Sequence, residues 1–203
     1  MVILEAQGLA KRYGRRRVLR DASLRVGAGE MIGVSGVNGA GKSTLLQILA
    51  GFLQPEAGTV RTRAPIGYSP QTPLLYGQLT IEEHFRYFAA ARGAGNSALE
   101  RGWELARRYR FEPWWRERVE TLSEGTRQKL NLALALAHDP ALLLLDEPYA
   151  GFDWETYLLF WDHAADLKRA GRSLLIVSHL FYDRSKFDRL LRVIDGRIEE
   201  ESR

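Results

Sequence analysis

The chain has 203 residues, enough for one sizeable hydrophobic core with a small added lobe but hardly for two full domains. Its composition is that of an ordinary globular protein, with 45% hydrophobic and 27% charged residues, a net charge of +4 and no cysteine, which excludes disulfides, thiolate catalysis and cysteine-bound zinc. No apolar stretch approaches the roughly 18 residues of a membrane-spanning helix, and the first residues do not resemble a secretory signal, so we expect a cytosolic chain.

Residues 3–9 and 18–26 have the pattern of two short strands, joined by a turn at 13–15 and closed by the glycine-rich residues 27–29. The densest basic run, three arginines at residues 15–17, falls at this turn. Such a run could contact nucleic acid or an anionic membrane, but no aromatic residues are interleaved with it as a stacking platform requires. We interpret it as a solvated turn and expect no nucleic-acid partner.

A glycine-rich loop follows the apolar run at residues 31–34 and precedes a helical pattern. This strand, loop and helix context indicates a P-loop, whose backbone N–H groups and helix N-terminus cradle phosphates, rather than a simple glycine-rich turn. Lys42 offers a positive charge to the β- and γ-phosphates, and Ser43 offers a hydroxyl to Mg²⁺. The expected nucleotide-binding positions in the loop are Gly36, Asn38, Gly39, Ala40, Gly41, Lys42, Ser43 and Thr44.

The pattern after the P-loop helix predicts a turn and a strand within residues 53–60 and another strand at 66–69. From residue 72 to about 137 the character becomes helical. A capping box at 80–83 opens one helix, and a second helical pattern covers 98–109. This segment is expected to form a helical lobe inserted into the sheet.

Parallel α/β character returns at residues 141–145, a continuous apolar run typical of a strand buried on both faces. A helix is predicted at 154–170, a second buried strand at 173–177, and a terminal hairpin at 190–200. The fold class that follows is α/β, a P-loop NTPase core with a mainly parallel sheet, an N-terminal antiparallel β subdomain and an inserted helical subdomain.

We expect a single domain over residues 1–203. Residues 1–71 and 138–203 are assigned to the core with its β subdomain, and residues 72–137 to the helical subdomain.

Two acids follow the apolar strand, where a P-loop fold needs a carboxylate for its metal. Asp146 is predicted to hold Mg²⁺ through its waters. Glu147, one residue further, is placed to orient and deprotonate a water that attacks the γ-phosphate. The alternative is an acidic strand end that caps the next helix.

The sequence Leu122-Ser123-Glu124-Gly125-Thr126 precedes an apolar helical run and forms a second helix N-terminus able to bind an anion. With the preceding motifs, it resembles the signature motif of the ATP-binding-cassette (ABC) ATPases, usually Leu-Ser-Gly-Gly-Gln. The resemblance extends over nearly the whole chain. Four further residues match the family in order and spacing: Tyr13 the aromatic that stacks on adenine, Gln71 the Q-loop, Asp153 the D-loop and His179 the switch histidine.

In this family the signature motif of one subunit closes over the P-loop of another, so that two ATP molecules lie between two head-to-tail cassettes. The resemblance implies ATP and Mg²⁺ as cofactors and a second cassette, identical or different, as partner. It makes Glu147, His179 and Lys42 the catalytic residues and Ser43, Gln71 and Asp146 the metal site. Ser123 and Gly125 then complete the partner's nucleotide site.

The sequence departs from the family pattern at two signature positions. Glu124 replaces the usual glycine and Thr126 the usual glutamine. The acid at 124 either points away from the γ-phosphate or weakens its binding. Phe152, in place of the usual leucine before Asp153, is a tolerable apolar exchange.

The resemblance implies the ATPase subunit of a membrane transporter, located at the cytoplasmic face of the membrane and working with separate membrane-spanning permease subunits that dock on the helical lobe. The segment after Gln71 is similar to that of small exporter cassettes, which favours export over import. The alternative is a soluble ABC ATPase that acts on ribosomes or nucleic acid. An inactive nucleotide-sensing subunit is disfavoured by the presence of Glu147 and His179. The transported substrate is not encoded in this chain.

Overall fold

An antiparallel sheet of three strands forms the N-terminal part of the computed structural model, which describes residues 1–93, 95–179 and 181–201. Its order is β2 (Arg16–Gly27), β1 (Val2–Tyr13) and β4 (Ala57–Thr62). The first two strands extend further than expected, because the pair between Tyr13 and Arg16 continues the ladder to the tip of the hairpin. The predicted antiparallel β subdomain is therefore confirmed, with Tyr13 ending a strand instead of starting a turn.

The central sheet of six strands is parallel except at its last strand, as expected. Near-continuous apolar runs account for this arrangement, since a parallel strand is covered on both faces. In spatial order its strands are β5 (Ile66–Ser69), β6 (Leu142–Asp146), β7 (Ser173–Val177), β3 (Met31–Ser35), β8 (Arg189–Ile194) and β9 (Arg197–Glu200).

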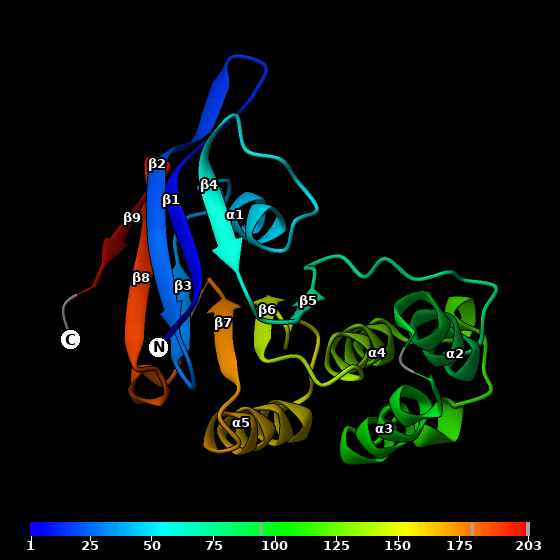
Figure 1. Cartoon of the computed structure of the whole chain (residues 1–203). Coiled ribbons are helices and arrows are strands. Elements are labelled where there is room, and N and C mark those ends of the chain that lie inside the picture. The colour runs from blue at the N-terminus through cyan, green and yellow to red at the C-terminus, as the bar shows by residue number, and fades with distance from the viewer. Residues whose placement is uncertain (94, 180, 202–203) are drawn as a thin grey trace.

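Helices cover both faces of the central sheet (Figure 1). Helix α1 (Lys42–Leu49) packs between the two sheets, in a cluster that includes Leu142 and Leu144. Leu143 and Leu145 point to the other face, where α5 (Trp154–Arg169) lies. The alternation along one buried strand thus builds two hydrophobic clusters, one on each face.

The helical lobe comprises α2 (Ile81–Arg92), α3 (Gly95–Arg108) and α4 (Glu124–Leu136). Thr80 and Glu83 form the expected capping box of α2, whereas α3 begins three residues before the predicted position. Two short 3₁₀ turns, at Glu112–Trp114 and Val119–Thr121, lie between α3 and α4. A further 3₁₀ turn, at Arg184–Lys186, lies between β7 and β8 of the core. Residue 94, within the predicted lobe, lies outside the described residues.

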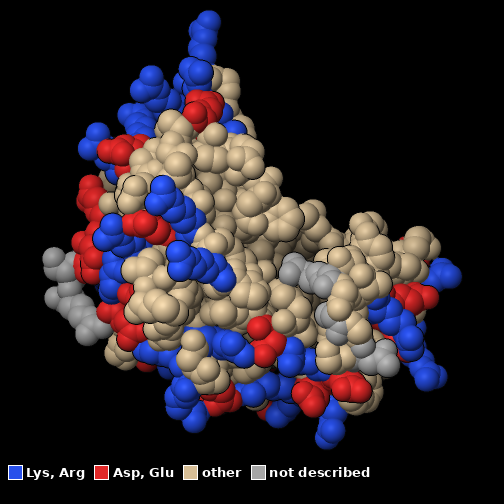
Figure 2. Space-filling model, viewed as in Figure 1, with Lys and Arg blue, Asp and Glu red and all other residues tan. Residues whose placement is uncertain are grey.

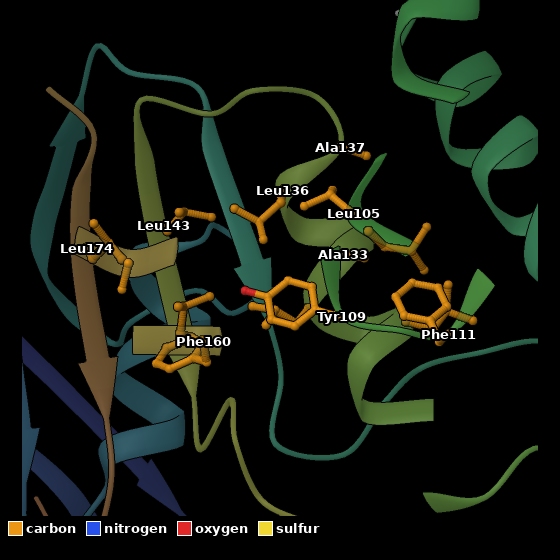
Figure 3. Close-up of a cluster of buried hydrophobic side chains, with 14 of the residues drawn as sticks. Leu105, Tyr109, Phe111, Ala133, Leu136, Ala137, Leu143, Phe160 and Leu174 are labelled. Carbon is orange, nitrogen blue, oxygen red and sulfur yellow. The ribbon is translucent and has the colours of Figure 1, made fainter. Parts of the chain in front are cut away.

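The lobe and the core share one hydrophobic cluster (Figure 3). Tyr109 and Phe111, which follow α3, are almost fully buried, and the cluster continues through Leu136 of α4 to Leu143 and Phe160 of the core. Full burial of one large side chain of this kind stabilises the folded state by about 1.5–3 kcal/mol. The contact makes α4 a bridge between lobe and sheet. The division into residues 1–71 with 138–203 and residues 72–137 stays a prediction.

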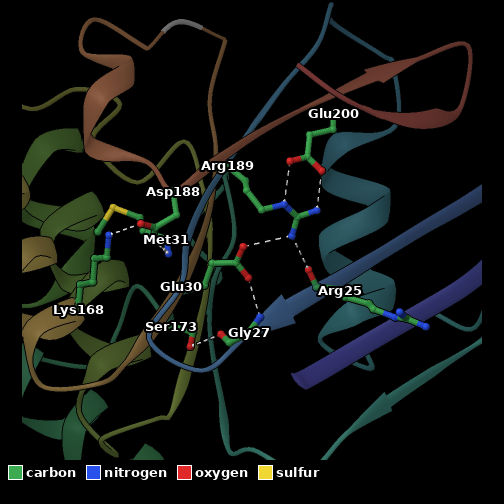
Figure 4. Close-up of polar contacts among 9 residues, drawn as sticks. All are labelled: Arg25, Gly27, Glu30, Met31, Lys168, Ser173, Asp188, Arg189 and Glu200. Atoms are coloured by element: carbon green, nitrogen blue, oxygen red, sulfur yellow. Dashed lines mark hydrogen bonds and ion pairs between the residues drawn. The ribbon is translucent and has the colours of Figure 1, made fainter. Parts of the chain in front are cut away.

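A group of ion pairs fixes β8 to the turn before the P-loop strand (Figure 4). Arg189 donates to Glu30 at 3.1 Å and to both oxygens of Glu200 at 3.0 and 3.1 Å. The hydrogen bonds with Glu200, and secondly those with Glu30, raise the pKa of the Arg189 guanidinium. Asp188, one residue earlier, accepts from the N–H of Met31 at 2.8 Å and from Lys168 at 2.6 Å. These contacts hold the start of β3 in register beneath the P-loop.

Basic side chains project from the tip of the hairpin between β1 and β2 (Figure 2). The three arginines at residues 15–17 are exposed there. No helix in the described ranges is both long enough and apolar enough to span a bilayer.

Candidate functional site

The P-loop leads from β3 into α1 through three glycines with positive φ, at residues 36, 39 and 41. A Cβ at Gly36 would lie 2.8 Å from the carbonyl oxygen of Val193, and one at Gly41 would lie 2.8 Å from the Cγ1 atom of Val18. Both the dihedral angles and the space therefore require glycine. The loop turns its backbone around a cradle at the N-terminus of α1, a geometry that favours anions.

Lys42 is only 6% exposed and lies against this loop. Its ammonium group donates to the carbonyl oxygens of Gly36 at 2.7 Å and of Val37 at 3.2 Å. Burial lowers the pKa of Lys42, while the nearby carboxylates of Glu147 and Asp146 oppose the shift. The positive charge is thus held at the cradle by contacts that are present within the chain itself.

Asp146 ends β6 beside the P-loop, and 2% of its surface is exposed. Its carboxylate accepts a hydrogen bond from Ser43, while its Oδ2 atom is buried and has no hydrogen-bond partner in the described part of the chain. Burial raises the pKa of Asp146, and the hydrogen bond with Ser43 opposes the rise. A buried carboxylate oxygen without a donor, next to a hydroxyl, fits a hard divalent cation such as Mg²⁺.

Glu147 follows in the left-handed region of backbone space, with φ of 49°. Its Oε2 atom accepts from the hydroxyl of Ser178 at 3.1 Å, and its Oε1 atom lies 3.3 Å from Nε2 of His179. Among the described residues no hydrogen-bond donor satisfies Oε1. A non-glycine residue with positive φ carries strain, which is often found at functional sites.

These groups line one open cavity of about 480 Å³. It contains most of the site residues expected from the sequence, and Tyr13, half exposed, stands at its edge. Gly36 and Ala40 belong to the loop without lining the cavity. The lining residues are Tyr13, Arg16, Val18, Asn38, Gly39, Gly41, Lys42, Ser43, Thr44, Gln71, Asp146, Glu147 and His179.

The signature residues lie at the start of α4, outside the cavity. Ser123 caps α4, accepting from the N–H of Thr126 at 3.2 Å, and neither Ser123 nor Gly125 lines the cavity. A Cβ at Gly125 would lie 2.9 Å from the carbonyl oxygen of Gly151, so the helix N-terminus packs directly on the D-loop backbone. Glu124, in the first turn of α4, is exposed.

Sequence reasoning missed several residues that complete the site. Arg16 donates to the carbonyl oxygen of Gly39 at 2.8 Å and lines the cavity, although the basic run was interpreted as a solvated turn. Gln128 donates to the carbonyl oxygen of Glu147 at 3.2 Å, and Ser178 binds the Glu147 carboxylate. These contacts join segments far apart in the chain, so no local pattern could reveal them.

The described residues contain no cluster of three or more His, Cys, Asp or Glu side chains able to hold a metal. The cation site expected from the sequence would be of another kind, because it would draw on one carboxylate, a hydroxyl, an amide oxygen and the phosphates of the nucleotide. Ser43, Asp146 and Gln71 all line the cavity, in agreement with such a site.

The fold and this cavity define an ATP-binding cassette. The family described as ABC transporter matches residues 19–150, and the chain therefore belongs to it. The family and the fold expected from the sequence are therefore confirmed.

The chain is similar to curated proteins of this family over almost its full length. It is 33% identical to "Nod factor export ATP-binding protein I" of Cupriavidus pinatubonensis over 96% of this chain and 64% of that protein. It is 30% identical to "Probable multidrug ABC transporter ATP-binding protein YbhF" of Escherichia coli over 97% of this chain and 36% of that protein. The chain thus spans less than two thirds of the length of these relatives.

Solved structures agree with the assignment. The structure of an ATP-binding subunit of an ABC transporter superposes with a TM-score of 0.90 at 29% identity, covering 98% of this chain and 90% of the other. A dimeric ATP-binding cassette bound to ADP and phosphate also gives a TM-score of 0.90, at 24% identity and 98% coverage of both chains, and supports the fold.

Proposed function

We propose that this chain hydrolyses ATP with the residues gathered in the 480 Å³ cavity and so drives transport through membrane-spanning subunits. The observation that carries the proposal is that the P-loop lysine, two strand-end acids and a histidine, from three separate segments of the chain, line one cavity. Such a convergence of charged groups around a phosphate cradle suits phosphoryl transfer.

Each residue has a definite task in the proposed reaction. Tyr13 stacks on adenine, the P-loop amides and Lys42 bind the phosphates, and His179 contacts the γ-phosphate. Ser43, Gln71 and Asp146 would hold Mg²⁺, which supplies charge neutralisation at the phosphates.

Glu147 acts as the general base. Its Oε1 atom receives a proton from the attacking water, the oxygen of that water bonds to the γ-phosphorus, and the bond from the γ-phosphorus to the bridging oxygen breaks to leave ADP. The hydrogen bond from Ser178 occupies Oε2 and leaves Oε1 for the water.

We propose further that a second cassette completes the site. Ser123 and Gly125 do not line the cavity of their own chain, yet they form a helix N-terminus suited to an anion. A head-to-tail pair of cassettes would place this N-terminus over the partner's nucleotide. The similar cassette bound to ADP and phosphate is dimeric, which supports pairing of two cassettes. A homodimer and a heterodimer are both compatible with it.

The proposed membrane partner is a separate permease subunit, with the cassette at the cytoplasmic face of the membrane and export favoured over import. The names of the two similar curated proteins, a Nod factor exporter and a probable multidrug transporter component, support this direction. An exposed patch on the lobe offers a surface for docking. It consists of Leu74, Tyr76 and Tyr87, which are 76%, 54% and 50% exposed.

Replacing Glu147 with glutamine tests the catalytic proposal. The Glu147→Gln variant should lose about 10²–10⁴-fold in kcat, because the amide cannot accept the proton, while it still binds MgATP and accumulates as a dimer. Glu155→Gln, an exposed acid at the start of α5, serves as the control and should keep wild-type turnover. Wild-type hydrolysis by Glu147→Gln would refute the general-base role.

Co-purification of the tagged full chain from native membranes tests the transport proposal. A multi-spanning protein recovered in stoichiometric amount would support it. Recovery of ribosomes or DNA without such a protein would refute it and favour the soluble ABC ATPase.

A further inference from the structure

The backbone of Glu147 is fixed on both sides of its peptide. Its N–H donates to the carbonyl oxygen of Val177 at 2.9 Å, and its own carbonyl oxygen accepts from Gln128 at 3.2 Å and from the N–H of Ala150 at 3.1 Å. With φ at 49°, the residue is held in a conformation that it would otherwise rarely adopt. The remaining freedom lies in the side chain, and its direction decides where the carboxylate points.

One oxygen of this carboxylate is held by Ser178, which is 2% exposed. The Ser178 hydroxyl donates to Oε2 at 3.1 Å, and the Ser178 backbone N–H donates to Val34 of the P-loop strand at 3.2 Å. The other oxygen, Oε1, lies 3.3 Å from His179, which lines the nucleotide cavity. Ser178 therefore binds Oε2 and leaves Oε1, which lies toward the nucleotide cavity, for an attacking water.

The side-chain hydroxyl of Tyr149 lies within hydrogen-bonding reach of Ser178. A serine hydroxyl has one proton, and here that proton goes to Glu147, so the Tyr149 hydroxyl must be the donor to the Ser178 oxygen. Burial raises the pKa of Tyr149 and the interaction with Ser178 opposes the rise, so the hydroxyl keeps its proton. The ring is confined by Tyr157 and Phe160, with centroids 5.3 and 5.4 Å away.

We propose that Ser178 and Tyr149 are positioning residues for hydrolysis. Through the chain from Tyr149 to Ser178 to Oε2, they select the rotamer of Glu147 that turns Oε1 toward the attacking water. The inference rests on the proposed general-base role of Glu147 and adds that this role depends on two hydroxyl groups that do not touch the nucleotide. A hydrogen bond to a charged group is stronger than one between neutral groups, so its loss is measurable.

The test separates turnover from nucleotide binding in the full chain. In Ser178→Ala, kcat should fall by about ten- to a hundredfold with KM for ATP within about twofold of wild type, because the rotamer is lost and the phosphate contacts remain. Ser178→Thr restores the hydroxyl and should recover most of kcat. Tyr149→Phe keeps the ring and should show a smaller loss of kcat, again at constant KM.

Ser173→Ala is the matched control. Ser173 begins strand β7, which ends one residue before Ser178. It is equally buried and hydrogen-bonds to Gly27 and Gly29 at the end of the strand away from Glu147. We expect it to lower the melting temperature without changing kcat. A structural role for Ser178 would give the same result as this control.

The double variant Ser178→Ala with Tyr149→Phe provides a second readout. Because both hydroxyls act in one chain, its kcat should be no lower than that of Ser178→Ala alone. Additive losses, or wild-type kcat in a folded Ser178→Ala, would overturn the inference. If Glu147→Gln retains activity, the general-base role itself fails, which is a distinguishable result.

Discussion

A buried histidine between the lobe and the core gives a quantitative prediction for stability against pH. His163 of α5 is 8% exposed, and its Nδ1 atom lies 2.9 Å from the hydroxyl of Tyr109. Burial, and secondly the charge of Arg108, lowers the pKa of His163 from 6.5 to about 4, while Asp166 opposes the shift. The neutral imidazole is therefore the form that the folded state accommodates.

The sign and size of the effect follow from linkage. The folded-state pKa lies below the unfolded value, so the unfolded chain binds more protons between pH 6.5 and 4, and the free energy of unfolding falls as pH decreases through this window. The complete pKa shift corresponds to about 3.4 kcal/mol, which is reached only well below pH 4, and the part expressed between pH 7.5 and pH 5 is about 2 kcal/mol.

Urea denaturation at pH 7.5 and pH 5 measures this contribution when wild type is compared with His163→Gln, whose amide can still accept from Tyr109 but does not titrate. Between pH 7.5 and pH 5, the free energy of unfolding of the variant should fall by about 2 kcal/mol less than that of wild type. The contributions of the other titrating groups are the same in both proteins and cancel when the two pH dependences are subtracted. Tyr109→Phe should start less stable and keep the wild-type pH dependence. Equal pH dependence in wild type and His163→Gln would refute the reasoning.

Two further predictions concern the nucleotide site. Glu124→Gly should leave ATPase activity equal or higher if the exposed acid is a liability near the partner's γ-phosphate, and a large loss in steady-state assays would show an active role instead. Arg16→Ala should raise KM for ATP by roughly tenfold, because it removes a charged donor bound to Gly39 at the edge of the cavity. Arg15→Ala, on the same exposed turn, should leave KM for ATP unchanged. Equal increases of KM in the two variants would show that the overall positive charge of the basic run matters rather than the contact with Gly39.

The sheet could be predicted because its strands follow local rules. The four leucines of β6 are all buried, as a continuous apolar run before two acids indicates. The order of the strands, in which β3 lies between β7 and β8, does not follow from any local pattern. Helix α3 begins at Gly95, with a polar stretch that the apolar periodicity did not include, so its start was placed too late.

The site residues that could be predicted are those that belong to a motif of consecutive residues. The P-loop residues and the two acids needed only their own neighbours for the prediction. Arg16 was missed because its contact with Gly39 crosses 23 positions of the chain, and Ser178 because its contact with Glu147 crosses 31. A hydrogen bond between segments depends on strand order, which a single sequence does not display.

The N-terminal half of α4 connects the signature motif to the chain's own catalytic residues. Gly125 packs on the Gly151 carbonyl, Gln128 binds the Glu147 carbonyl, and Asn131 donates to Pro70, next to Gln71, at 2.8 Å. All three contacts are made by one helix, so α4 cannot be displaced from the sheet without breaking them or carrying the three segments along. In the proposed dimer, Ser123 at the start of this helix meets the partner's nucleotide. A force on the signature motif would therefore reach Glu147, and Pro70 next to Gln71, through the hydrogen bonds of Gln128 and Asn131, which gives two composite sites a physical route to influence each other.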